Sequence, residues 1–133
     1  MKKLLLIISI AIGETAYGHS IAAGNHHSLF LCSNGSTMAC GYNTDGELGN
    51  GYTTQSNIPV QVITLTGITA ISGGGAHSLF LKNDGTVWAC GHNVFGQLGD
   101  GTTTNATTSV QSIIITGITA ISAGNLHSLF LKN

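Results

Sequence analysis

One five-residue string, His-Ser-Leu-Phe-Leu, occurs three times in the chain, starting at His27, His77 and His127, at equal intervals of 50 residues. Residues 21–70 and 71–120 align without a gap and match at roughly half of their positions. A gap-free period of this length predicts one supersecondary unit that is stacked on itself. Residues that are duplicated with such a unit usually serve its shape, which argues against a single catalytic centre.

The composition narrows the classes of partner. The chain has 133 residues, only 7% of them charged, with a formal net charge of −1 and no arginine. It therefore lacks the basic surface that nucleic acid requires, and no nucleic-acid partner is expected. Its 19 glycines, among many threonines and isoleucines, are typical of turn-rich β structure.

The first 18 residues have the pattern of a signal peptide. Lys2 and Lys3 precede the apolar stretch 4–12, and Ala16-Tyr17-Gly18 offers a small-x-small cleavage site. The apolar stretch is about half of the ~20 residues that a membrane span needs, so no membrane span is expected after removal. We predict a mature chain beginning near His19, secreted or at the cell surface, with a leader of bacterial style. The alternative is a buried N-terminal strand or helix.

Three cysteines remain, Cys32, Cys40 and Cys90, and no two have C-x-x-C spacing. A zinc site or a thioredoxin-type motif is therefore not indicated. Export would permit disulfides, but Cys40 and Cys90 occupy the same repeat position and are expected to face the same way. We expect free, buried thiols that behave as small apolar residues.

Each repeat begins with a predicted hairpin. In the second repeat, residues 76–82 and 87–91 have strand character, and Asp84-Gly85 between them is a strong signal for a two-residue type I′ turn. That turn would pair Leu81 with Trp88 and Leu79 with Cys90. Both faces of the hairpin are then largely apolar, so both should be covered by neighbouring units.

A glycine-punctuated loop, residues 91–101, follows the hairpin, and further strands are expected around residues 110–115 and 117–122. Four short strands in about 50 residues fit a propeller blade, whereas the rungs of a parallel β-helix are much shorter. The sequence therefore predicts an all-β fold built from blades of four antiparallel strands. The predicted units are residues 19–70, 71–120 and the opening of a third at 121–133.

Three motifs carry a resemblance to a known family. In the second repeat they begin at Gly74, Asn83 and Gly91, and they read Gly-Gly-Ala-His-Ser-Leu-Phe-Leu, Asn-Asp-Gly-Thr-Val-Trp and Gly-His-Asn-Val-Phe-Gly-Gln-Leu-Gly. This pattern resembles the repeat of the regulator of chromosome condensation family, over residues 21–133. The resemblance implies a closed β-propeller, most often with seven blades. Cys40 and Cys90 stand where the family has an aromatic residue, and Met38 stands where the second repeat has Trp88.

Two full repeats and part of a third make about two and a half blades, so the expected ring is incomplete. A partial version of a longer protein is the first interpretation, and assembly of short chains into a ring is the second. An incomplete propeller leaves open sheet edges, which favour self-association.

The sequence indicates no catalytic residue, no metal and no cofactor. The resemblance implies that His27, His77 and His127 are structural and tie neighbouring backbone together within the blade. The glycine loops lack the Gly-Lys-Ser/Thr of a phosphate-binding loop, and no metal-ligand spacing joins the histidines. The carboxylates lie in loops or turns, where solvated side chains are expected.

One end of the repeats carries the candidate binding surface. The loop before each repeated histidine and the Gly-x-Asn-x-x-Gly loop should emerge together, and this end varies most between copies. The candidate protein-binding residues are Asn25, His26, Tyr42, Asp45, His92, Phe95, Asn125 and Leu126. We expect a secreted or cell-surface, non-enzymatic scaffold that binds an unidentified protein partner. The alternative is a non-catalytic part of a larger extracellular enzyme or adhesin.

Overall fold

The computed structural model describes residues 20–63, 65–112 and 116–133, so the predicted signal peptide at 1–18 lies outside the described residues. These residues form ten strands and no helix, and hence no helix able to cross a membrane. The strands are β1 (Ser20–Ala23), β2 (His27–Leu31), β3 (Thr37–Gly41), β4 (Ser56–Gln61), β5 (Ile68–Gly73), β6 (His77–Lys82), β7 (Val87–Gly91), β8 (Ala106–Gln111), β9 (Ile118–Ala123) and β10 (Ser128–Lys132).

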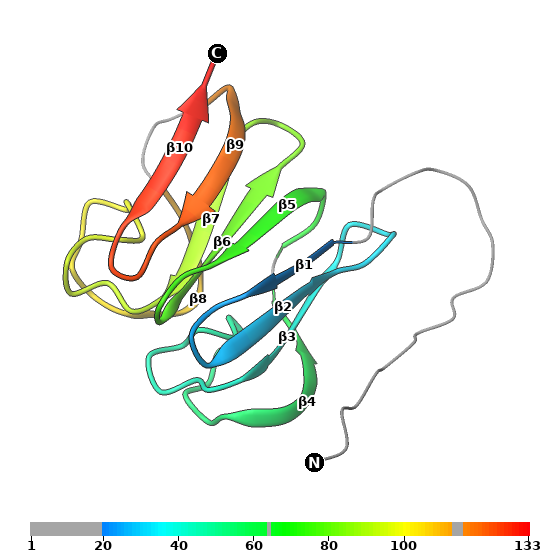
Figure 1. The fold of residues 1–133 in the computed structure, drawn as a ribbon, viewed down its shortest axis with the longest axis vertical. Helices are drawn as coiled ribbons and strands as arrows, with labels where there is room; N and C mark the ends of the chain where they lie inside the picture. The colour runs from blue at the N-terminus through cyan, green and yellow to red at the C-terminus, as the bar shows by residue number, and fades with distance from the viewer. Residues whose placement is uncertain (1–19, 64, 113–115) are drawn as a thin grey trace.

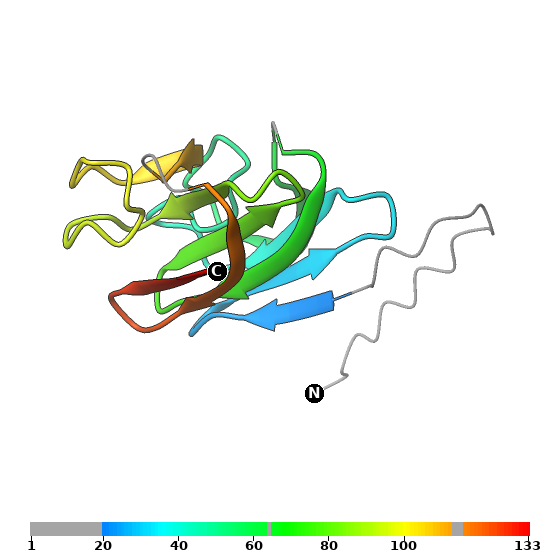
Figure 2. The same cartoon turned by 90° about the horizontal axis from the view of Figure 1, so that it is seen from above.

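The strands form three antiparallel sheets in the orders β1-β2-β3-β4, β5-β6-β7-β8 and β9-β10. The sheets are stacked one after another and do not close into a ring (Figures 1 and 2). This arrangement confirms the all-β class and the incomplete set of four-stranded blades. The predicted repeat borders at residues 70/71 and 120/121 fall inside β5 and β9, which open the second and third sheets.

The predicted hairpin register is wrong by one residue. Phe80 pairs with Trp88, and Ser78 pairs with Cys90. The Gly85 N–H donates to the Lys82 carbonyl at 3.0 Å, and Gly85 adopts a φ of 75°. The connection is therefore a three-residue loop with one glycine in the left-handed region, not a two-residue type I′ turn. A shift of one residue moves Trp88 and Cys90 to the opposite face from the one expected.

The later strands also differ from the expectation. The strand expected around residues 110–115 is β8, Ala106–Gln111, and residues 113–115 lie outside the described part of the chain. The strand expected at 117–122 is β9, which pairs with β10 in the next sheet instead of completing the second. Each sheet therefore starts with the strand that precedes its repeat histidine.

The alternation of side chains gives every sheet two different faces. The front face carries the repeat histidine and two leucines, as at His77, Leu79 and Leu81 in the second sheet. The back face carries a serine, a phenylalanine and, in full sheets, a cysteine, as at Ser78, Phe80 and Cys90. The front of each sheet packs on the back of the next, and the fully buried Leu29 lies in one core cluster with Phe80 and Cys90. These two interfaces form the hydrophobic core.

The three cysteines are free, as expected, but only Cys90 is buried. Burial raises the pKa of the Cys90 thiol to about 12, so it stays protonated and unreactive. Cys40 is only partly buried, because it lies on the back face of the first sheet, which no described sheet covers.

Candidate functional site

A histidine–serine bridge holds each pair of neighbouring sheets together. The Ser78 Oγ donates to the Glu47 carbonyl at 2.7 Å and lies 2.9 Å from the His27 Nε2. Because the single hydroxyl proton goes to the carbonyl, the serine oxygen accepts from the His27 Nε2–H. His77 makes the same contact to Ser128 at 3.0 Å. The histidine is structural, as expected, but it connects two sheets and does not act within one blade.

The bridging histidines are held in the neutral form. Desolvation lowers the pKa of His27 to about 4, with a smaller contribution from the charge of His26. Desolvation likewise lowers the pKa of His77 to about 4, helped by other histidines nearby. The His77 Nδ1 is buried without a hydrogen-bond partner among the described residues, so a proton there would have no acceptor.

A buried asparagine organises each long loop. The Asn93 Oδ1 accepts from the Leu98 N–H at 2.9 Å, and its Nδ2 donates to the Thr102 and Thr104 carbonyls at 3.2 and 3.1 Å. Asn43 makes the equivalent bonds in the first repeat. The sequence motif includes this asparagine, but the sequence analysis gave it no role. The signal that could have revealed it is a polar side chain kept unchanged between loops whose outer residues differ.

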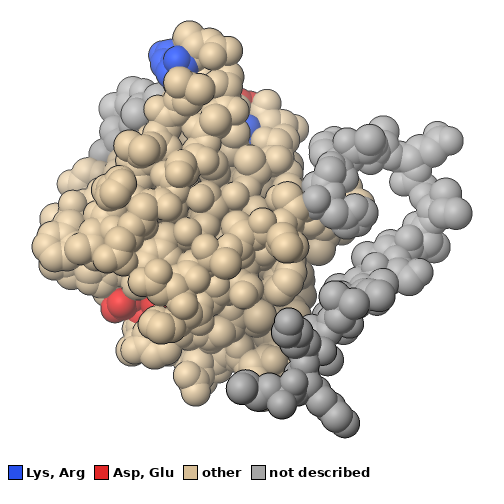
Figure 3. Space-filling view, viewed as in Figure 1, with Lys and Arg blue, Asp and Glu red and all other residues tan. Residues whose placement is uncertain are grey.

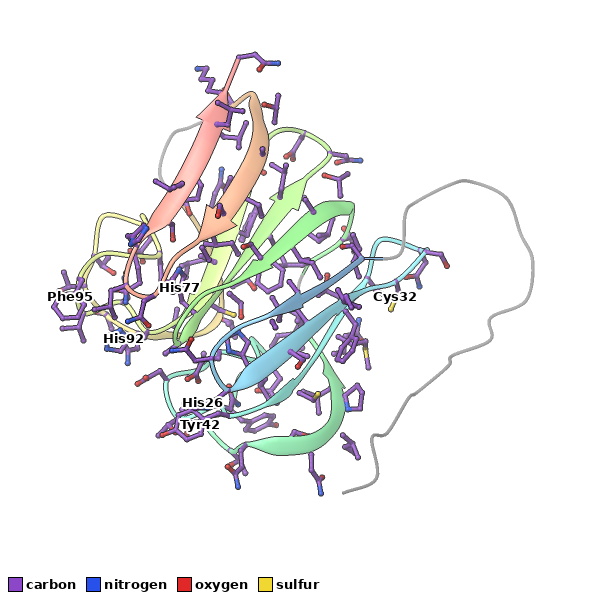
Figure 4. All side chains as sticks on the ribbon, in the orientation of Figure 1. His26, Cys32, Tyr42, His77, His92 and Phe95 are labelled. Atoms are coloured by element: carbon purple, nitrogen blue, oxygen red, sulfur yellow. The ribbon has the colours of Figure 1, made fainter. Side chains whose placement is uncertain are left out.

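The loops of one end bring several candidate residues together (Figure 4). The His26 and Tyr42 rings meet edge to face with centroids 6.2 Å apart, and the His92 and Phe95 rings lie 6.0 Å apart. The aromatic rings are solvent-accessible: Tyr42 is 44% exposed and Phe95 is 66% exposed. The expected clustering of these loops at one end is therefore present.

The other candidates are placed differently. Asn25 donates to the Asn125 side chain at 3.3 Å, which joins loops 100 residues apart. The Asp45 carboxylate accepts from the Asn105 Nδ2 at 2.8 Å, so it links the first long loop to the second sheet. Leu126 is exposed and lines a hollow together with Phe95.

The candidates predicted from the sequence omit two exposed apolar residues at this end, Tyr52 and Val94. Both occupy positions that differ between the repeats, which is the signal that could have found them. Beside Tyr42 lies a groove whose lining includes His26, Thr54, Gln55 and Asn57 but no Asp, Glu, Lys or Arg among the described residues. Figure 3 shows how few charged side chains lie on the face that it displays. Among the described residues, no three His, Cys, Asp or Glu side chains gather to hold a metal ion.

The two repeats carry different residues at one buried loop position, Glu47 in the first and Gln97 in the second. In the second, the Gln97 Oε1 accepts from the Phe95 N–H, and its Nε2 donates to the His92 Nδ1 at 2.7 Å. In the first, the Glu47 Oε2 accepts from the Asp45 N–H at 3.0 Å. The Glu47 Oε1 is buried with no hydrogen-bond partner among the described residues. Desolvation by burial raises the pKa of Glu47, which shows that the charged carboxylate is disfavoured there.

Introducing the His92–Gln97 pair of the second repeat at positions 42 and 47 should stabilise the first repeat. Glu47→Gln removes the desolvated carboxylate and keeps an acceptor for the Asp45 N–H, so it should raise the free energy of unfolding at pH 7. Tyr42→His then supplies the acceptor for the new amide, and we expect a coupling energy of about 1 kcal/mol. Urea unfolding of the two single variants and the double variant measures that coupling. The gain from Glu47→Gln should shrink in acid, where Glu47 is protonated. A coupling energy of zero would contradict the expected bond.

Comparison with known proteins is consistent with this geometry. A family model of the regulator of chromosome condensation (RCC1) repeat matches residues 34–81 and 84–131, and a second model of that repeat matches residues 19–47 and 68–97. The structure of Prp20p from Saccharomyces cerevisiae is similar, with a TM-score of 0.77 and 20% identity over 91% of this chain and 32% of that one. Human WBSCR16 gives a TM-score of 0.77 and 21% identity, with the same coverage of each chain.

Yeast RCC1 (Prp20) bound to Kap60 gives a TM-score of 0.71 and 26% identity over 90% of this chain and 29% of that one. The work on Prp20p describes its binding to Gsp1p and histones. The chain thus spans about a third of the length of each of these proteins.

Proposed function

Since the chain belongs to the regulator of chromosome condensation (RCC1) repeat family, we propose that it is a non-enzymatic scaffold that binds a protein partner through its long-loop end. Propellers of this family commonly mediate protein–protein interaction and are typically non-catalytic. The observation that carries the proposal is a contrast between the buried backbone of the long loops, which is the same in both repeats, and the exposed side chains, which differ. Both long loops have the same buried asparagine bonds, while the side chains that they expose differ.

The exposed residues suit recognition of a protein. Tyr42 and Phe95 present rigid aromatic surface at low entropic cost, and aromatic residues dominate the binding energy of many interfaces. The groove beside Tyr42 offers hydroxyl and amide groups for hydrogen bonds. Three side chains of types that could serve catalysis, His27, His77 and Asp45, are engaged in structural bonds.

The proposed location is extracellular or at the cell surface, and the leader pattern at residues 1–18 supports it. Intact-mass analysis of the chain expressed in a bacterium tests it. A mature N-terminus at or near His19 in the exported fraction agrees with the proposal, and an uncleaved chain retained in the cytoplasm contradicts it.

Truncating the exposed aromatics should weaken partner binding. A photo-crosslinking side chain at position 95 should capture the partner, and the same side chain at Ile58 should not, since Ile58 is equally exposed but lies on the outer strand β4. With the captured partner purified, Phe95→Ala and Tyr42→Ala should each weaken binding at least about tenfold, or roughly 1.4 kcal/mol. Ile58→Ala should bind like the original chain. Equal crosslinking from both positions, or unchanged affinity of both aromatic variants, would place the interface elsewhere.

A further inference from the structure

Both Asn-Gly sequences of the first repeat correspond to an Asp-Gly sequence in the second. Asn34-Gly35 aligns with Asp84-Gly85, and Asn50-Gly51 aligns with Asp100-Gly101. An asparagine followed by glycine is chemically labile, because glycine has no side chain to hinder the attack of its amide nitrogen on the asparagine side chain. The reaction releases ammonia and can leave an aspartate, which is the residue that the second repeat already carries at both positions.

The hairpin turn at Asn34 has the hydrogen bonds that hold an aspartate in the second repeat. The Asn34 Oδ1 accepts from the Ser36 N–H at 3.0 Å and from the Ser36 hydroxyl at 2.7 Å. The Asp84 Oδ1 accepts from the Thr86 N–H at 3.0 Å and from the Thr86 hydroxyl at 2.6 Å. These bonds to Thr86 lower the pKa of Asp84, so a carboxylate in such a turn is charged at neutral pH. The turn at Asn34 therefore fits the reaction product as well as the asparagine.

The long loop at Asn50 also has an aspartate counterpart, but it is tied into a buried network. The Asn50 Oδ1 accepts from the Tyr52 N–H at 3.1 Å and from the Nδ2 of the buried Asn43 at 3.2 Å. Asp100 accepts the equivalent two bonds in the second repeat, at 3.0 and 3.1 Å. An aspartate would thus fit at both positions, and the two sites differ in how readily the reaction can begin.

The attacking glycine nitrogens are held by different partners. The Gly35 N–H donates to the Cys32 carbonyl at 2.9 Å, inside the same hairpin loop, whereas the Gly51 N–H donates at 2.9 Å to the Thr107 carbonyl of β8 in the next sheet. The hairpin loop is bonded to the next sheet from the Ile68 N–H to the Gly35 carbonyl at 3.3 Å, which does not involve the Gly35 nitrogen. Opening one hairpin loop costs less free energy than separating a long loop from a packed sheet.

Solvent exposure separates the two sites in the same direction. Asn34 is exposed, whereas Asn50 is half-buried. Their counterparts Asp84 and Asp100 are likewise exposed and half-buried, although the second sheet has a neighbouring sheet on each side. The difference therefore belongs to the two kinds of loop and does not depend on what lies beside the first sheet.

We propose that Asn34 is a site of spontaneous deamidation and that the fold protects Asn50 from the same reaction. The Gly35 nitrogen loses its proton to a base in solution and attacks the Asn34 Cγ. The new C–N bond forms while the bond from Cγ to Nδ2 breaks, so ammonia leaves and a succinimide ring remains. Water then adds to one of the two ring carbonyls, which gives aspartate by opening at Cγ or isoaspartate by opening at the main-chain carbonyl. The net change is the loss of ammonia and the gain of water, with no oxidation or reduction.

The two products have different consequences for the turn. Aspartate keeps both bonds from Ser36 and changes the formal net charge of the chain from −1 to −2. In the second repeat Lys82 lies 3.6 Å from the Asp84 carboxylate, whereas the first repeat has Cys32 at the position of that lysine. Isoaspartate adds a methylene group to the main chain, so it should disturb the turn. This inference is independent of the proposed function, because the hairpin turns lie at the end of the strands opposite the long loops.

Incubation of the purified chain at pH 8 and 37 °C with a thiol reductant, followed by peptide mapping with mass spectrometry, tests the proposal. In the folded chain, position 34 should convert at least about tenfold faster than position 50, since the exposed hairpin loop opens more readily. In concentrated urea both loops are open, and the two Asn-Gly sequences should convert at similar rates. Fragmentation that distinguishes aspartate from isoaspartate should find both products at position 34.

Two substitutions at position 34 serve as matched controls. Asn34→Gln should remove the acidic isoform that appears on isoelectric focusing, because glutamine does not form the five-membered ring with the next nitrogen. Asn34→Asp reproduces the aspartate product and should match the original chain in circular dichroism and in urea unfolding at pH 7. The proposal would be overturned if position 34 converted no faster than position 50 in the folded chain. It would also be overturned if position 34 stayed intact during an incubation that converts the unfolded chain.

Discussion

The protein is expected to lose its stability between pH 6.5 and pH 4, driven by protonation of His27 and His77. Both have a pKa of about 4 in the folded chain, against an ordinary value of 6.5. Because the folded pKa is depressed, the unfolded chain binds more protons in this window, and stability falls as the pH falls. Each pH unit between the two values is worth about 1.4 kcal/mol, so each histidine removes roughly 3 kcal/mol. The two together approach the total stability of a small protein.

The physical cause is the bridge between sheets. The protonated ring would be a buried cation, and the His77 Nδ1 would become a donor with no acceptor among the residues described. Glu47 acts in the opposite direction, because its raised pKa makes its protonation in acid favourable to the folded state. Two histidines lose stability over this window, whereas Glu47 is a single site.

Urea unfolding at pH 7, 6, 5 and 4 measures this effect. His77→Gln disturbs the bridge to Ser128, so it should lower the free energy of unfolding at pH 7. Because glutamine cannot titrate, the same change should flatten the dependence of stability on pH. His26→Gln is the matched control, because His26 is exposed and precedes a bridging histidine. It should leave most of the pH dependence intact. If His77→Gln and His26→Gln gave the same pH dependence as the original chain, the bridge would not be the acid-sensitive element.

The second large effect is expected at Asn93. Its side chain is fully buried and bonds one N–H and two carbonyls of the loop backbone. Asn93→Ala leaves these groups unpaired, and each costs about 1–3 kcal/mol. We expect a total loss of about 3–5 kcal/mol, in the range that marks a broken buried network.

Asn93→Asp separates the hydrogen bonds from the lost volume. It keeps the shape and the acceptor for the Leu98 N–H, but it loses both donors and faces Asp100, whose carboxylate lies 3.1 Å from the present Nδ2. It should therefore be about as destabilising as Asn93→Ala in thermal or urea unfolding at pH 7. Asn57→Ala is the control, since Asn57 is exposed in β4. Stability retained by Asn93→Asp would show that volume alone matters at this position.

The period of 50 residues, with four short strands expected in each unit, was sufficient to predict the fold class, because stacked units bury both faces of the repeated hairpin. The hairpin register was not predictable in the same way. Asp84-Gly85 is compatible with two loop lengths, and only the backbone bond from Gly85 to Lys82 distinguishes them. The strand around residues 110–115 was predicted from a run of apolar residues, whereas the position of β8 is set by its pairing with β7.

The candidate site was predictable only in part. Variation between the repeats indicated Tyr42 and Phe95, and the structure places both on one exposed end. The variation between the repeats did not reveal that Asp45 bonds to Asn105, because the two residues are 60 positions apart and belong to different repeats. The serine that receives the histidine bond lies in the following repeat, so a comparison of equivalent positions could not identify it.

The bridge from His27 to Ser78 has a consequence for how such genes lengthen. Every 50-residue unit contains both halves of the contact, a histidine for the unit after it and a serine for the unit before it. A tandem duplication therefore inserts a unit that already fits both of its neighbours. Evolution can add or remove whole units in single steps without inventing an interface, while the loop ends of each new copy diverge separately.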